Sequence, residues 1–345
     1  MIRFGPSGIP LSCKGRTLLD GVKDVHKLGL SAIEVQFLRM KVRTRPVEED
    51  YIDKKARDIE DKFIIGVNRG TDYKKIRVDD FDKVLEPGDM IHFIKGGVAE
   101  EFYRFPKIGR VAKELDVNVA LHTPYYMKFT NTEGEIVEKS KFGLKYSSAM
   151  ASELDSDLVV THLGLKEDDM DDDDISDAVI ENIRDIRNWI TDTFEDGPKI
   201  GIEIQAGEDV YGSLDEVLDV CSKVSGTIPV INFAHIKASE QYELEEEEDF
   251  AEIFDMCKNF VPDEYYVNFS GVEQRRGEYR FTPIKRGELR FDPLVEHLIN
   301  TDDNVTVISG SPLKEHDAMY MKVIFERIYS KKIAKELRRK KKDGE

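Results

Sequence analysis

The 345-residue chain lacks several features that define other classes of protein. Its three cysteines, Cys13, Cys221 and Cys257, share no close spacing and form no CxxC pair, so we expect a reducing environment and no disulfide framework. No apolar run approaches the roughly 18 residues of a membrane span. The N-terminus, MIRFGPSGIP, has no basic-then-apolar signal pattern. Together these absences predict a cytoplasmic protein.

Basic residues are outnumbered by acidic ones. There are 51 Lys and Arg residues against 69 Asp and Glu, which gives a formal charge of −18. This balance disfavours general affinity for nucleic acid, although it is compatible with a local basic groove. Acidic residues gather in two runs, EDDMDDDD (167–174) and ELEEEEDF (243–250). We interpret these runs as solvated loops or helix starts rather than as metal-buffering or partner-docking segments.

Short apolar β-type runs alternate with helical segments along the chain. The runs are residues 2–6, 32–37, 118–124, 157–164, 199–205, 229–235, 265–271 and 305–312. Between them, residues 177–194 and 213–224 place apolar residues three and four apart, and a last helix begins near Glu315. Eight strands alternating with helices predict a (β/α)8 TIM barrel. A doubly wound open sheet is the alternative, but no Gly-rich phosphate loop follows the first strand.

One connection between strands is far longer than the others. About 80 residues separate the second strand from the third, whereas the other gaps hold about 20 to 35. Within it, residues 76–97 have the pattern of a strand, a Pro-Gly turn and a second strand. We therefore predict a small β-containing subdomain at 40–100, rather than a disordered insertion, because MIHFI needs to be buried.

The barrel is expected to span residues 1–330 and to be followed by a basic tail, 331–345. Residues 331–342 (KKIAKELRRKKK) contain eight basic residues in twelve. They are suited to contact a nucleic-acid backbone, although basic residues also favour the C-terminal end of a helix.

Polar residues stand at the ends of three consecutive predicted barrel strands: His122, His162 and Glu203. Pro124 cannot donate to a sheet ladder, so the third strand has to stop near His122. The carboxyl ends of TIM-barrel strands converge on one face. A single strand histidine is more often a core residue, but two imidazoles and a carboxylate form a known catalytic zinc set. The three together predict a metal centre.

The motifs LHTPYY, VVTHLG, IEIQAGE, NFAH and SGSP occur in this order, each after an apolar strand. Together they resemble the endonuclease IV family of apurinic/apyrimidinic endonucleases, within the wider group of xylose-isomerase-like barrels. The segments MIRFGPSGIP and LGLSAIEVQF are similar to archaeal members. That family uses three zinc ions to hydrolyse the phosphodiester 5′ to an abasic site. The resemblance therefore implies zinc as cofactor and abasic or damaged DNA as partner.

The resemblance also assigns metal ligands. It places His122, His162 and Glu203 on a first zinc, with Glu203 bridging to a second and His235 on a third. The remaining family ligands are substituted in this chain, by Asn232 for aspartate, Asn268 for histidine, Gly310 for glutamate and Phe281 for histidine. We therefore expect fewer than three zinc ions, with Glu203 and His235 as catalytic residues and His235 orienting substrate or transferring a proton.

Basic residues cluster in the loop after the seventh predicted strand: Arg275, Arg276, Arg280, Lys285 and Arg286. They are candidates for binding phosphate oxygens, and a plain solvated loop is the alternative interpretation.

Three functions are compatible with the sequence. The first is an endonuclease IV-like phosphodiester hydrolase with a reduced metal site. The second is a non-catalytic nucleic-acid-binding relative that has lost the metals. The third is a sugar-phosphate isomerase or epimerase, which needs paired acidic ligands that Asn232 and Gly310 do not provide.

Overall fold

Eight parallel strands form the centre of the computed structural model, which describes residues 1–36, 41–70, 81–275 and 278–343. They hydrogen-bond in the order β1-β13-β10-β9-β8-β7-β6-β2. Their bounds are β1 Ile2–Pro6, β2 Ala32–Gln36, β6 Asn118–His122, β7 Leu158–Thr161, β8 Lys199–Glu203, β9 Thr227–Asn232, β10 Tyr265–Phe269 and β13 Val305–Ser309. Each overlaps a predicted run, and the (β/α)8 TIM barrel is confirmed.

The barrel nearly closes between its first and second strands. Ser7 and Glu34 form a parallel bridge there, and the backbone N–H of Gly8 donates to the carbonyl oxygen of Glu34 at 2.6 Å. This approach needs a residue without a side chain at position 5, because a Cβ on Gly5 would lie 1.8 Å from the carbonyl oxygen of Ala32. Gly5 therefore allows the closure that brings Ser7 to Glu34.

Replacing Gly5 with alanine is expected to lower the free energy of unfolding by about 3 kcal/mol, because β1 and β2 have to separate to admit the methyl group. Urea unfolding of the Gly5→Ala and Gly310→Ala variants tests this. Gly310 is the matched control, since a Cβ there would meet no atom of the described residues within 4 Å. Equal unfolding midpoints for the two variants would contradict the steric argument.

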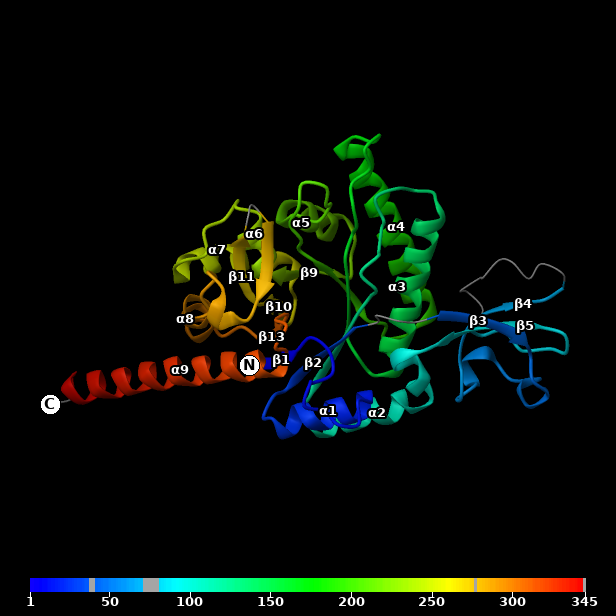
Figure 1. The fold of residues 1–345 in the computed structure, drawn as a ribbon, viewed down its shortest axis with the longest axis horizontal. Coiled ribbons are helices and arrows are strands. Elements are labelled where there is room, and N and C mark those ends of the chain that lie inside the picture. The colour runs from blue at the N-terminus through cyan, green and yellow to red at the C-terminus, as the bar shows by residue number, and fades with distance from the viewer. Residues whose placement is uncertain (37–40, 71–80, 276–277, 344–345) are drawn as a thin grey trace.

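Helices surround the barrel on its outer side (Figure 1). Their bounds are α1 Leu18–Lys27, α2 Phe105–Glu114, α3 Glu135–Glu153, α4 Asp172–Thr193, α5 Leu214–Lys223, α6 Phe233–Ala238, α7 Glu247–Cys257, α8 Asp292–Asn300 and α9 Glu315–Asp343. Helix α4 begins inside the acidic run 167–174, where the Asp171 side chain accepts from the Asp174 backbone N–H, and α7 begins inside the run 243–250. Both runs thus serve as helix starts, as expected.

The long connection contains a three-stranded antiparallel sheet in the order β3-β5-β4 (Lys41–Pro46, Met90–Lys95 and Phe63–Asn68). A short helix, η3 (Gly97–Arg104), leads from it into α2. The sheet lies beside α3 and α4 in Figure 1, and the ring of Phe81 is 5.9 Å from that of Trp189 on α4. Strand β5 corresponds to the second strand predicted within 76–97. Residues 76–80 of the first predicted strand lie outside the described residues, and residues 81–85 form a turn and one isolated bridge, between Val84 and Lys55, rather than a strand.

Helix α9 extends through residues 331–343, the greater part of the predicted basic tail. It projects well beyond the barrel in Figure 1, and the C-terminus lies at its far end. The described helices include no candidate for a membrane span, since none combines the required length with the required apolar character.

Candidate metal centre

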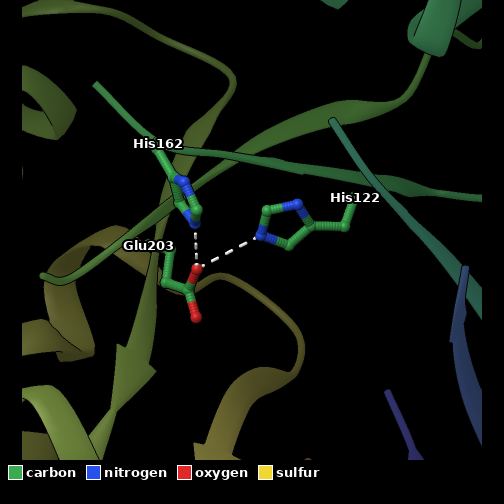
Figure 2. A group of neighbouring side chains, drawn as sticks. All are labelled: His122, His162 and Glu203. Carbon is green, nitrogen blue, oxygen red and sulfur yellow. Dashed lines mark hydrogen bonds and ion pairs between the residues drawn. The ribbon is translucent and has the colours of Figure 1, made fainter. Parts of the chain in front are cut away.

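Three side chains converge at the carboxyl ends of neighbouring strands. His122 and Glu203 are the last residues of β6 and β8, and His162 directly follows β7. Figure 2 shows both imidazoles directed at one carboxylate: His122 Nε2 lies 3.2 Å and His162 Nε2 lies 2.7 Å from Glu203 Oε2. All three potential ligand atoms lie within 4.8 Å of one another. Within the described part of the chain, no other group of three His, Cys, Asp or Glu residues meets this geometry.

The hydrogen bonds of His122 indicate which of its two ring nitrogens can bind a cation. Its Nδ1 lies 2.7 Å from the carbonyl oxygen of Thr123, which can only accept, so we assign a proton to Nδ1. Nε2 then needs either a second proton or a cation, because a bare lone pair would face Glu203. Burial alone lowers the pKa of His122, but the hydrogen bond to Glu203 and the nearby Glu34 carboxylate outweigh it and raise that pKa to about 9. A backbone partner for the second ring nitrogen is also typical of histidines that bind metals.

The other carboxylate oxygen of Glu203 is held by two amides. The side-chain Nδ2 groups of Asn232 and Asn268 donate to Oε1 at 2.8 and 2.9 Å. Burial raises the pKa of Glu203, but the hydrogen bonds from His122 and His162 outweigh it and hold that pKa well below its ordinary value. Glu203 is therefore ionised and fixed in orientation, with Oε2 turned toward the imidazoles.

Zinc binding at this site is expected to depend on pH. Because the ion has to displace the His122 Nε2 proton, the apparent affinity should rise about tenfold per pH unit up to the pKa of about 9 and level off above it. Competition with a chromophoric chelator at several pH values between about 6.5 and 9.5 measures this slope. An affinity that does not change with pH would contradict the assignment of the displaced proton.

His235 lies beside the centre but outside the group of three that can share one ion. The sequence assigned it to the end of a strand, whereas β9 ends at Asn232 and His235 belongs to α6. The strand ends earlier because Asn232 Oδ1 accepts from the backbone N–H groups of Ala234 and His235 and so caps the helix. The ring of His235 packs 4.8 Å from that of Phe281.

The substituted positions gather at the same cavity, which has a volume of about 200 Å³. Its walls include the three converging side chains as well as Asn232, His235, Asn268, Phe281 and Gly310. Both polar groups of the Asn232 side chain form hydrogen bonds: Nδ2 donates to Glu203, and Oδ1 accepts from the α6 backbone. The amide therefore has a structural role. Asn268 Oδ1 is buried and has no hydrogen-bond partner among the described residues, which leaves one acceptor to bind a ligand or water.

Glu34 is a cavity residue that the sequence analysis missed. It is 1% exposed, and its carboxyl group accepts from Ser7 Oγ at 3.0 Å and from the Tyr266 hydroxyl at 3.3 Å. Burial raises its pKa; the charge of His122 opposes this and the nearby Glu203 adds to it. The one available signal was an acidic residue inside the apolar run AIEVQF.

The predicted phosphate-binding residues either do not line this cavity or are not among the residues that the structure describes. Arg276 is not among the described residues, and Arg275 is described only as the end of strand β11 (Gly271–Arg275). Arg280 lies on β12 (Glu278–Thr282), opposite Glu273 of β11 in the strand register. Side chains alternate along a strand, so Arg280 points to the opposite face of the hairpin from Phe281. The ammonium of Lys285 lies 4.3 Å from the centre of the Tyr320 ring on α9. Their role in binding phosphate stays a prediction.

Known proteins share this fold. A family model described as xylose isomerase-like TIM barrel matches residues 92–321. An uncharacterised protein of Methanocaldococcus jannaschii is 22% identical over 326 residues, which is 93% of this chain and 96% of that protein. Endonuclease IV from Thermus thermophilus superposes with a TM-score of 0.59 at 15% identity, covering 95% of this chain and 99% of that one. The 3-keto-D-glucoside 4-epimerase of E. coli superposes with a TM-score of 0.58 at 9% identity, covering 95% and 100%.

Proposed function

This chain belongs to the family of xylose isomerase-like TIM barrels, and on that basis we propose that it is a metal-dependent hydrolase of phosphodiester bonds in nucleic acid. The observation that carries the proposal is the convergence of His122 Nε2, His162 Nε2 and Glu203 Oε2 within 4.8 Å in a cavity at the carboxyl ends of the strands. Two imidazole nitrogens and one carboxylate oxygen fit zinc, and they leave a position for water or substrate.

A divalent ion at this centre would supply Lewis-acid activation of the phosphate and of the attacking water. The chain supplies the rest of the site. Glu203 offsets part of the added charge, and the amides of Asn232 and Asn268 keep its carboxylate oriented. The carbonyl of Thr123 fixes the tautomer of His122.

His235 is suited to act as a hydrogen-bond donor to the substrate. Its Nδ1 accepts from the backbone N–H of Ala206 at 3.3 Å, so in the neutral ring the proton is on Nε2. Burial lowers the pKa of His235, and this effect keeps the ring neutral near pH 7. An Nε2–H group at the cavity can bind a phosphate oxygen or donate to the leaving group.

The reduced metal set and the choice of damaged DNA are the finer parts of the proposal. Asn232, Asn268, Phe281 and Gly310 replace family ligands, so we expect about one zinc ion rather than three. The substrate class rests on the fold shared with endonuclease IV and on the ordered motifs that resemble that family.

The test uses protein purified without chelators and a duplex oligonucleotide that carries one abasic site. We expect about one zinc per chain and strand cleavage that is lost with EDTA and restored by zinc. Protein that holds zinc but leaves both abasic and intact strands uncut would reject hydrolysis. Protein that binds the oligonucleotide without metal or cleavage would favour the non-catalytic relative.

An epimerase or isomerase is the second candidate, because one observation favours it. Glu34 places a second buried carboxyl group on the same cavity as Glu203, and moving a proton between carbon atoms needs such acid–base groups. Against it, Asn232 and Gly310 deprive the centre of the paired acidic ligands that this chemistry uses. Deuterium incorporation from D2O into a ketose phosphate would distinguish it from hydrolysis.

A further inference from the structure

The inserted sheet lies beside helices α3 and α4 (Figure 1), and a cavity of about 320 Å³ lies between the insertion and these helices. We call it the insertion cavity. The insertion contributes residues of η2 (Ala56–Asp58), β4 and η3 together with Phe81. The barrel contributes residues of α3 and of the segment 193–196 at the end of α4. The walls thus come from two parts of the fold.

The insertion cavity lies far from the metal centre along the barrel strands. Its barrel wall includes Glu153, a few residues before β7 begins, and residues 193–196, just before β8 begins. The metal centre, in contrast, is built at the carboxyl ends of these strands. The two cavities share no described lining residue. The wall from η2, β4 and Phe81 also lies outside residues 92–321, which match the family model.

Phenylalanine rings form the floor of the insertion cavity. The ring of Phe63 stacks on that of Phe102 with 4.3 Å between centroids, and the ring of Phe81 stacks on Phe63 at 6.2 Å. Phe194 adds a fourth ring from the barrel side. All four side chains are buried or half-buried. Aromatic faces pack against apolar groups and attract cations.

The rim of the insertion cavity is acidic. It carries four exposed carboxylates, those of Glu153, Asp155, Glu195 and Asp196. Among the described lining residues Arg57 is the one basic side chain, and its guanidinium already pairs with Asp82 Oδ2 at 2.9 Å. Of the four carboxylates, Asp155 also pairs with Lys113 Nζ at 3.4 Å. The remaining negative charge attracts cations to the rim and repels anions.

We propose that the insertion cavity binds a small organic cation, in which an ammonium group is carried on an apolar or aromatic body. The body packs on the phenylalanine floor, and the ammonium group stays at the rim, where it pairs with the carboxylates. The cavity volume lies at the small end of the range for ligand sites, which is about 300 to 1,000 Å³. A ligand bound there contacts the insertion and the barrel helices at once. The inference is independent of the proposed hydrolysis.

Three phenyl compounds of similar size test the charge preference: 2-phenylethylamine, 2-phenylethanol and phenylacetate. Calorimetric titration of the full chain should give a Kd of about 1 mM or tighter for the amine. The neutral alcohol and the anionic phenylacetate should bind at least about tenfold more weakly, because they cannot pair with the carboxylates. Raising the salt concentration from about 0.05 M to about 0.5 M should weaken binding of the amine, because screening reduces the attraction of the rim.

Trp189, the only tryptophan of the chain, reports whether the ligand occupies this cavity. The centre of its ring lies 5.9 Å from that of Phe81 and 5.6 Å from that of Phe194, and both phenylalanines line the cavity. Binding of the amine should therefore change the emission of Trp189 with the Kd that calorimetry gives. Heat of binding without a change in emission would place the amine at another site and overturn the inference.

The double variant Glu153→Gln, Glu195→Gln removes two charges of the rim with little change in shape. Both side chains are exposed, so the fold should survive, and binding of the amine should weaken about fivefold. Glu181→Gln is the matched control, because Glu181 is exposed on α4 but does not line the cavity.

The outcomes separate this inference from the proposed hydrolysis. The inference is overturned if the amine does not bind, if the alcohol or phenylacetate binds as tightly, or if the double variant binds like wild type. Treatment with EDTA should leave binding of the amine unchanged, since the two cavities share no described lining residue. A failure of metal binding or cleavage therefore leaves the result for the insertion cavity intact.

Discussion

Zinc binding is expected to weaken at least about a hundredfold when His162 is replaced with alanine. In the proposed site His162 supplies one of three ligand atoms, and losing a ligand should cost no less than the roughly 10- to 100-fold typical of losing its supporting partner. The side chain is only half-buried at the edge of the cavity, so its removal opens space to solvent rather than leaving a hole in the core. The fold should therefore survive. Competition titration and zinc content per chain measure the effect.

Two further variants sharpen this experiment. Glu203→Gln keeps the volume of the side chain and an acceptor for the amides of Asn232 and Asn268, but it removes the negative charge. It should lose zinc to a similar extent, since a neutral amide replaces the carboxylate among the three potential ligands. His316→Ala is the control, because His316 is exposed at the start of α9. Wild-type zinc content in both His162→Ala and Glu203→Gln would place the metal elsewhere.

The part of the site that the sequence predicted depends on neighbouring strands. β6, β7 and β8 are consecutive in the barrel, so the residues that end them have to meet at one edge. His122, His162 and Glu203 could therefore be predicted from the apolar runs that precede them. The same reasoning located the barrel, because each run is long enough to identify a strand without knowledge of its partner.

The parts that escaped prediction depend on closure of the barrel and on side-chain orientation. Glu34 receives a hydrogen bond from Tyr266, which is 232 residues away, and it meets Ser7 only because β1 approaches β2 across Gly5. No local pattern encodes that approach. Asn232 was predicted as a substituted ligand. Its role as a helix cap could not be predicted, because the sequence does not show whether the oxygen or the nitrogen of an amide faces the helix.

Restoring the four substituted ligands is expected to raise zinc content from about one ion per chain to two or three. The variant combines Asn232→Asp, Asn268→His, Phe281→His and Gly310→Glu. It adds two carboxylates and two imidazoles to a cavity that already contains His122, His162 and Glu203. Several metals that clamp the attacking and leaving oxygens accelerate phosphodiester cleavage, so abasic-site cleavage should rise with the zinc content.

The geometry at three of the four restored positions favours the experiment. In the part of the chain that the structure describes, a Cβ at Gly310 would meet no atom within 4 Å, so the glutamate has room to enter. At residue 232, aspartate keeps the oxygen that caps α6, although it loses the amide that donates to Glu203. The new carboxylate then faces Glu203, and an added cation relieves their repulsion. The ring of Phe281 already contacts that of His235, so a histidine at 281 would stand beside a second imidazole.

The Gly310→Glu single variant serves as the control for this restoration, because one added carboxylate without its partners should not hold a further ion tightly. Zinc content by atomic emission and initial rates of abasic-site cleavage, measured on the same preparations, link metal number to activity. If wild-type protein already holds three zinc ions and cleaves as fast as the restored variant, the four substitutions did not reduce the site. In that case the additional ligands come from residues other than Asn232, Asn268, Phe281 and Gly310.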